Sequence, residues 1–121
     1  MTKKHKEYVN RYATDLWNIC ESVIKSGTVT ELWSKRLAYC RATVICYEYR
    51  DKPVIYLLKS YDTIVACVIV NNSMIYGVDM LRKVYGYTAT SSQHIAKFFS
   101  HYVDFKARVN DMDSIRLRYY P

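Results

Sequence analysis

The residues of this 121-residue chain best suited to catalysis are its three histidines, at positions 5, 94 and 101. His94 and His101 are seven residues apart in a segment of helical periodicity, so they share a helix face but lie about two turns apart. That separation is too large for both to bind one metal ion without a third ligand between them. An alternative function is an enzyme in which His94 pairs with a carboxylate as a general acid or base.

The other familiar catalytic patterns are absent from the sequence. Asp62, Asp79 and Asp104 would have to converge to act as paired carboxylates, and each stands where turns ordinarily place aspartate. The chain has no serine in a G-x-S-x-G elbow, no P-loop, and no G-x-G-x-x-G or H-E-x-x-H pattern. We therefore expect a protein that is not an enzyme and that uses no cofactor and no metal.

A second group of residues is suited to binding. The candidates run from just before a predicted helix into its first turn, and they are Arg82, Lys83, Tyr85, Tyr87, Thr88, Thr90, Ser91, Gln93 and His94. Arginine and lysine can contact phosphates, tyrosine can stack on bases, and free N–H groups at a helix N-terminus favour anions. In the alternative interpretation, the two tyrosines are half-buried strand residues and the threonines only cap the helix. Arg50, Lys52 and Lys59 are further basic contact candidates.

Composition and charge favour a basic, folded binding protein. Half of the residues are apolar, and 18 basic against 11 acidic residues give a formal charge of +7, which is spread along the chain. A basic surface favours nucleic acid, anionic membranes or acidic protein partners without selecting among them. The 13 tyrosines suit half-buried sheets as well as binding surfaces. The length fits one domain, residues 1–121.

The sequence also bears on the location of the protein. Cys20, Cys46 and Cys67 lie in apolar periodic segments and no cysteine pair has C-x-x-C spacing, which favours reduced core thiols. The N-terminus has no apolar run of the kind found in signal peptides, and the longest apolar run, residues 64–70, is too short to span a bilayer. We expect a cytoplasmic protein with no membrane partner.

The element pattern predicts an α+β fold. An N-terminal amphipathic helix over residues 2–26 is closed by Gly27, and Thr30 can cap a short second helix that holds Leu32 and Trp33. The functional interpretation of the first helix is a basic helix that lies on DNA or on a partner. The alternative, which we favour, is an ordinary helix that covers a sheet.

The rest of the chain predicts an antiparallel β-meander, a second helix and an edge strand. The meander has strands at 39–49, 54–59, 63–70 and 73–78, a turn in which Pro53 ends the ladder, and an Asn71–Asn72 hairpin turn. Thr90 or Ser91 caps a helix near 91–103, and residues 115–119 alternate as a C-terminal edge strand should. We expect the helices to lie on one face of the sheet.

Two stretches resemble a known family. Residues 58–66, LKSYDTIVA, and residues 87–98, YTATSSQHIAKF, are similar to the pattern L-x-S-Y-x-T-x-V-A, then Y-S-x-T-T-S-x-H-I-x-x-F. This pattern belongs to an uncharacterised family of small bacterial, phage and plasmid proteins, and the resemblance covers about residues 56–102. Thr88 and Ser91 stand where Ser and Thr are usual, and Gln93 stands where Arg is often found.

The resemblance implies an origin in a phage or mobile element and no assigned enzyme activity. Because small phage proteins are often binders, the first hypothesis is an inhibitor of a host antiviral defence complex, acting on a protein or nucleoprotein in the manner of anti-CRISPR proteins. The alternative is a basic nucleic-acid-binding accessory or regulatory protein of the element, with DNA or RNA as its partner. A homodimer through the C-terminal edge strand is a further expectation.

Overall fold

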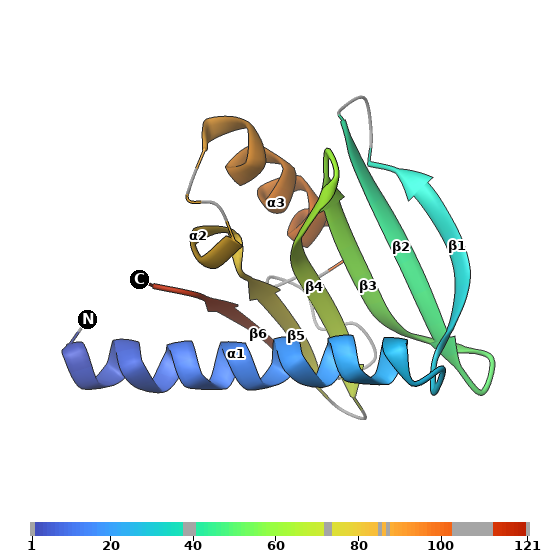
Figure 1. Cartoon of the computed structure of the whole chain (residues 1–121), viewed down its shortest axis with the longest axis horizontal. Coiled ribbons are helices and arrows are strands. Elements are labelled where there is room, and N and C mark those ends of the chain that lie inside the picture. The colour runs from blue at the N-terminus through green and yellow to red at the C-terminus, as the bar shows by residue number, and fades with distance from the viewer. Residues whose placement is uncertain are drawn as a thin grey trace.

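A computed structural model describes residues 2–37, 41–71, 74–84, 86, 88–102 and 113–120. It contains three helices and six strands in this part of the chain (Figure 1). Their bounds are α1 Lys3–Lys25, β1 Thr30–Arg36, β2 Ala42–Tyr49, β3 Lys52–Ser60, β4 Thr63–Asn71, β5 Met74–Asp79, α2 Leu81–Val84, α3 Ala89–Tyr102 and β6 Asp113–Arg118. The predicted α+β fold is confirmed.

The six strands form one sheet in the order in which they occur in the chain, β1 to β6. The first five pair antiparallel with their sequence neighbours, which confirms the meander. The last strand, β6, pairs parallel with β5 and forms one edge of the sheet, as predicted for an edge strand. A parallel neighbour requires a crossover connection, and α2 and α3 lie in that connection.

The turns differ from the expectations in detail. Arg50 and Asp51 both have positive φ, 52° and 65°, so they form a two-residue hairpin turn of the kind whose twist matches that of the flanking strands. Pro53 does not end the ladder but lies within β3, opposite Glu48. Asn71 belongs to β4 and pairs with Met74, so it is a strand residue and not the turn residue that was predicted, and residue 72 lies outside the described residues.

The helices lie on opposite faces of the sheet, so the expectation of one covered face is wrong. Alternate residues of β3 show this: Leu58 belongs to a core cluster with Phe98 of α3, whereas Leu57 belongs to a second cluster with Cys20 of α1. Because successive strand side chains point to opposite faces, the two clusters lie on opposite faces of the sheet. The fold therefore has three layers, α1, the sheet, and α3.

The prediction of a short helix that is capped by Thr30 and holds Leu32 and Trp33 is also wrong, because Thr30–Arg36 forms β1. From Thr30 opposite Glu48 to Arg36 opposite Thr43, this segment pairs with β2, with one register shift near Leu32. Side-chain packing accompanies the pairing, since the Trp33 ring lies 6.0 Å from that of Tyr56.

The N-terminal helix was predicted correctly, including its closure by Gly27, which has φ 77°. Figure 1 shows α1 lying across the strands, with its N-terminal end reaching past β6. Residues 2–8 are all exposed, in agreement with this overhang. Ala13 and Cys20 are the fully buried residues of α1. Cys46 and Cys67 are also buried and free, as predicted, while Cys40 lies outside the described residues.

Candidate functional site

The contact residues predicted from the sequence lie at three separate places. Arg82 and Lys83 are in α2, near the C-terminus of the chain. Figure 1 places the turn between β2 and β3, which holds Arg50, at the opposite end of the molecule. The third group surrounds the start of α3, and Tyr85 and Tyr87 lie outside the described residues. The predicted residues therefore do not form one continuous site.

The cations of α2 stand beside two tyrosines at the C-terminus. The Arg82 guanidinium carbon lies 5.9 Å from the centre of the Tyr120 ring. The Lys83 ammonium nitrogen lies 5.8 Å from the centre of the Tyr119 ring. Both distances are within reach of the electrostatic attraction between a cation and an aromatic face. Both tyrosines are half-buried, so part of each side chain faces solvent.

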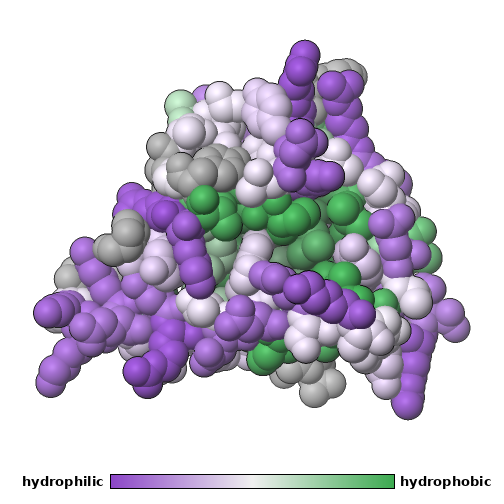
Figure 2. Space-filling view, viewed as in Figure 1, coloured by the Kyte–Doolittle hydropathy of each residue, from purple (hydrophilic) through white to green (hydrophobic). Residues whose placement is uncertain are grey.

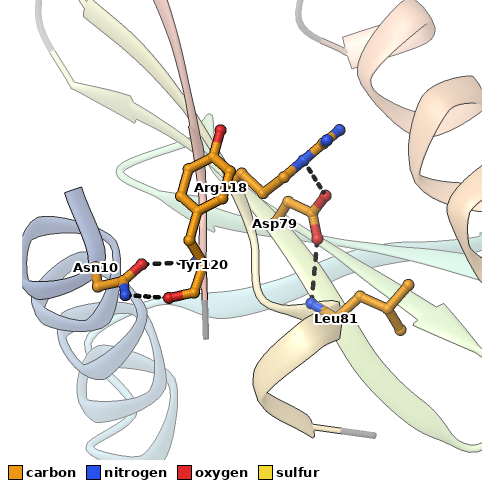
Figure 3. A network of polar contacts seen from close by, with 5 residues as sticks. All are labelled: Asn10, Asp79, Leu81, Arg118 and Tyr120. Atoms are coloured by element: carbon orange, nitrogen blue, oxygen red, sulfur yellow. Dashed lines mark hydrogen bonds and ion pairs between the residues drawn. The ribbon is translucent and has the colours of Figure 1, made fainter. Parts of the chain in front are cut away.

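A buried aspartate holds α2 and the C-terminal segment together (Figure 3). The Asp79 carboxylate accepts a hydrogen bond from the Leu81 N–H at 3.1 Å through one oxygen, and its other oxygen lies 3.3 Å from Nε of Arg118. The Tyr119 N–H donates to the backbone carbonyl of Asp79 at 2.9 Å. Because Asp79 ends β5 and its side chain contacts both partners, it fixes α2 relative to β6.

Asn10 of α1 holds the very end of the described chain. Its side-chain oxygen accepts from the Tyr120 N–H at 2.6 Å, and its amide nitrogen donates to the Tyr120 carbonyl (Figure 3). These two bonds occupy both backbone polar groups of Tyr120. A second copy could pair with the chain at Tyr120 only by displacing Asn10, so a homodimer through this strand, which stays a prediction, would have to form along residues 113–118.

The stripe of α1 that carries Asn10 continues beyond the sheet as lysines. Lys3, Lys6 and Asn10 are spaced by three and four residues, so they share one helix face with the buried Ala13. The first turn of α1, residues 3–6, has no acidic residue and three lysines, although the positive end of the helix dipole favours acidic groups there. A bound anion would remove this unfavourable arrangement.

These residues define one surface, which we call the basic tyrosine surface. Its members are Lys3, Lys6, Arg82, Lys83, Tyr119 and Tyr120. Of these residues, only Arg82 and Lys83 are predicted from the sequence. The signals that could have indicated the others are the lysine-rich start and the ending RLRYY, but their proximity depends on the parallel pairing of β6.

The start of α3 contains a buried polar cluster. Ser60 Oγ lies 2.9 Å from Nδ1 of His94 and 3.4 Å from Oγ of Ser91. Thr88 caps the helix, because its Oγ1 accepts from the Ser91 N–H at 3.2 Å, so the predicted cap at Thr90 or Ser91 is wrong. Thr90 and Gln93 are exposed on the first turns. The cluster thus ties the end of β3 to α3.

The contact between Ser60 and His94 has the residue types of a nucleophile and its base. Ser60 is 1% exposed and His94 4% exposed. A substrate could not reach the serine oxygen without displacing α3 or the end of β3, so the geometry favours a structural role. The carboxylate partner considered for His94 is replaced by a serine hydroxyl. Tyr61, which follows Ser60, lies beside the imidazole, with ring centres 6.1 Å apart.

Protonation of His94 is expected to destabilise the fold at mildly acidic pH. Burial lowers the pKa of His94, and the nearby positive charge of Lys97 lowers it further. The unfolded chain, with a histidine pKa of about 6.5, then binds the proton more readily, so the free energy of unfolding falls as pH decreases through and below that value. Urea unfolding between pH 7.5 and 5, values spanning this window, measures the effect.

The matched variants are His94→Gln, which keeps a polar side chain near Ser60, and His5→Gln on the exposed start of α1. We expect the first to reduce the pH dependence and the second to leave it unchanged. Equal pH dependence in all three proteins would show that His94 titrates alike in the folded and unfolded states.

The remaining basic candidates lie apart from the basic tyrosine surface. Arg50 is exposed, and its guanidinium carbon lies 5.2 Å from the Tyr49 ring centre. Lys52 is exposed beside it, and Lys59 is half-buried near the other end of β3. Within the described ranges, no cluster of three or more His, Cys, Asp or Glu side chains is arranged to hold a metal ion. Of the described helices, none has the length and apolar character needed to cross a membrane.

Comparisons with known proteins identify no relative of this chain. No protein family matches the chain, no curated protein matches it, and no solved structure resembles it closely enough to count as a match. The function must therefore be inferred from the surface chemistry.

Proposed function

We propose that this protein is a non-enzymatic binder of single-stranded nucleic acid and that the basic tyrosine surface contacts it. The observation that carries this proposal is the placement of Arg82 and Lys83 over the rings of Tyr120 and Tyr119, at 5.9 and 5.8 Å. Cations beside aromatic rings are the combination used along single strands, where the cations contact phosphates and the rings stack on bases. Lys3 and Lys6 extend the positive charge along the overhanging end of α1.

Single-stranded nucleic acid fits this surface better than a duplex. Tyrosine rings can stack only on bases that are not enclosed in a base-paired stack, and stacking tolerates any sequence. The chain shows no helix-turn-helix, zinc-finger or other motif that reads base edges in a groove. We therefore expect weak sequence preference and strong salt dependence.

A second candidate function is an inhibitor that binds a host defence protein or nucleoprotein in the bacterial cytoplasm. The observation that favours it is an apolar cleft beside α1, at a distance along the helix from the basic tyrosine surface. A protein that occupied both surfaces could bind a nucleoprotein. The mobile-element origin belongs to this second proposal and rests on the family resemblance alone.

The first proposal predicts a steep loss of affinity with salt. If four cations contact phosphates, the dependence for a single strand has a slope of about −0.7 per contact, so affinity falls about 50-fold between about 50 and 200 mM salt. Fluorescence anisotropy with labelled single-stranded DNA and RNA measures this loss. Duplexes of the same sequence should bind more weakly.

The test variant is the double substitution Arg82→Ala/Lys83→Ala, and the matched control is Arg50→Ala/Lys52→Ala at the opposite end of the molecule. The first should reduce the salt-dependent loss to about 7-fold, because two phosphate contacts are removed, whereas the control should keep the wild-type slope. Equal losses in the two variants would mean that the overall charge of +7, and not this surface, causes binding. Absence of binding to every nucleic acid would remove the proposal.

A further inference from the structure

The N-terminal helix leaves part of its side of the sheet uncovered. A helix is about 10–12 Å wide, whereas strands of six to nine residues are about 20–30 Å long. Because α1 lies across the strands (Figure 1), it covers only a strip of the sheet, and an apolar cleft lies on either side of it. Figure 2 shows this surface as a patch of hydrophobic side chains next to the helix.

On one side of α1 this surface forms a cleft of about 250 Å³, which we call the α1 cleft. It is lined by five helix residues and two strand residues: Trp17, Cys20, Glu21, Ile24, Lys25, Leu57 and Ile64. Five of these seven side chains are apolar. The other side of the helix has a separate apolar cleft, lined in part by Ile19, which is 55% exposed.

Basic side chains border the α1 cleft. In the sheet, Ile64 pairs with Lys59, Lys59 pairs with Thr43, and Thr43 pairs with Arg36. Directly opposed residues point to the same face, so Lys59 and Arg36 stand on the face that carries the cleft. Counted over the same face, three cations, Lys25, Lys59 and Arg36, stand against two acidic residues, Glu21 in the lining and Glu31, which pairs with Tyr47. Lys25 and Lys59 therefore place positive charge at the cleft, and Arg36 adds to it two strands further along the same face.

We propose that the α1 cleft is a docking site for an amphipathic helix of a partner protein that carries acidic residues along its edges. A helix laid beside α1 at the usual spacing of about 8–10 Å would place its apolar side chains in the cleft. Its acidic residues would lie over Lys59, Arg36 and Lys25, which supplies charge complementarity. This is a helix-in-groove interaction and does not depend on nucleic-acid binding by the other surface.

The probe is a synthetic helical peptide with leucines on one face and glutamates along both edges. A twin carries lysines in place of the glutamates, and a third peptide has the first composition in scrambled order. Titrated into isotope-labelled protein, the acidic amphipathic peptide should shift the amide signals of residues lining the α1 cleft. We expect it to bind about tenfold or more tightly than either control peptide, because only it satisfies both the apolar and the charged surface.

Trp17 provides a second readout. The chain has two tryptophans, so Trp33→Phe leaves Trp17, a lining residue, as the single fluorophore. Its emission should change with the acidic amphipathic peptide and not with the scrambled one.

Matched variants locate the binding site. Ile24→Ser removes an apolar lining residue, and Ile19→Ser is its control on the other side of α1. Lys59→Glu reverses a border charge, and Lys52→Glu is its control at the other end of β3. We expect about tenfold weaker binding for the first member of each pair and unchanged binding for the controls. Lys59→Glu should in addition improve binding of the lysine twin, a gain that loss of folding could not produce.

Three outcomes would overturn the proposal. Equal binding of the scrambled peptide would mean that charge alone attracts it. Shifts at Arg82 and Lys83 would place the peptide on the basic tyrosine surface, and absence of binding by all peptides would mean that the cleft takes no helix of this kind. The nucleic-acid titrations are read separately, so failure of one proposal leaves the other intact.

Discussion

Replacing Arg118 with alanine is expected to lower the free energy of unfolding by about 2–4 kcal/mol. The carboxylate of its partner, Asp79, is fully buried, whereas the Arg118 side chain is 34% exposed. Removing the arginine leaves a buried negative charge without that cation, and the Leu81 N–H offsets only part of the loss. The estimate is below the largest values for buried pairs because Arg118 is already partly solvated.

The contact between Asp79 and Arg118 also predicts an order of stability among three variants. Asp79→Asn removes the buried charge and leaves an arginine that can turn toward water, so its cost should be smaller than that of Arg118→Ala. The double variant Asp79→Asn/Arg118→Ala also lacks the buried charge, so it should be more stable than Arg118→Ala alone. Urea unfolding followed by circular dichroism measures all three, with the exposed Arg11→Ala as control.

A double variant less stable than Arg118→Ala would contradict this account. It would show that the negative charge of Asp79 stabilises the fold even without Arg118, through its charge-assisted hydrogen bond from the Leu81 N–H. In that case α2 would depend on Asp79 independently of β6.

Local patterns were sufficient to predict the elements that carry their own signals. The helix at Lys3–Lys25 has an apolar stripe and Gly27 after it, and both were identified from the sequence. The segment Thr30–Arg36 was misassigned because Glu, Leu, Lys and Arg are good helix formers and Thr30 resembles a cap. Its strand state depends on pairing with β2, which is tertiary information.

Chain direction in the sheet was not predictable either. The alternation of residues 115–119 indicates a strand but is the same for parallel and antiparallel pairing. Only the crossover through α3 shows that β6 runs parallel to β5. The parallel direction of β6 brings Tyr119 and Tyr120 to α2. From the sequence, only the Arg82 and Lys83 part of the basic tyrosine surface could therefore be predicted.

The polar cluster at the start of α3 is a further contact that the sequence alone did not predict. Ser60 and His94 are 34 positions apart, and both lie in the stretches that resemble a family pattern. From the sequence, His94 is a binding candidate or a histidine that could pair with a carboxylate, and nothing predicts its contact with Ser60. In the fold they contact each other, and their burial makes them part of the packing between β3 and α3.

The second large effect concerns Phe99, whose ring lies against Gly77 of β5. A Cβ built on Gly77 would stand 3.1 Å from Cε1 of this ring, so the glycine leaves the space that the ring fills. Phe99 is 2% exposed in the cluster beneath α3. Phe99→Ala should therefore lower the free energy of unfolding by about 3–5 kcal/mol, through lost burial and the cavity that remains.

This contact should reverse the sign of the stability change that Gly77→Ala causes, depending on whether the Phe99 ring is present. In the wild-type background Gly77→Ala crowds a rigid ring and should cost about 1–2 kcal/mol. In the Phe99→Ala background the crowding is gone, and alanine should stabilise the strand by about 0.5–1 kcal/mol because it loses less backbone entropy than glycine on folding. Urea unfolding of the four proteins tests this, and an equal cost of Gly77→Ala in both backgrounds would mean that the ring does not restrict this position. If the sign changes as expected, the glycine is explained by the position of α3 on the sheet and not by the needs of the strand itself.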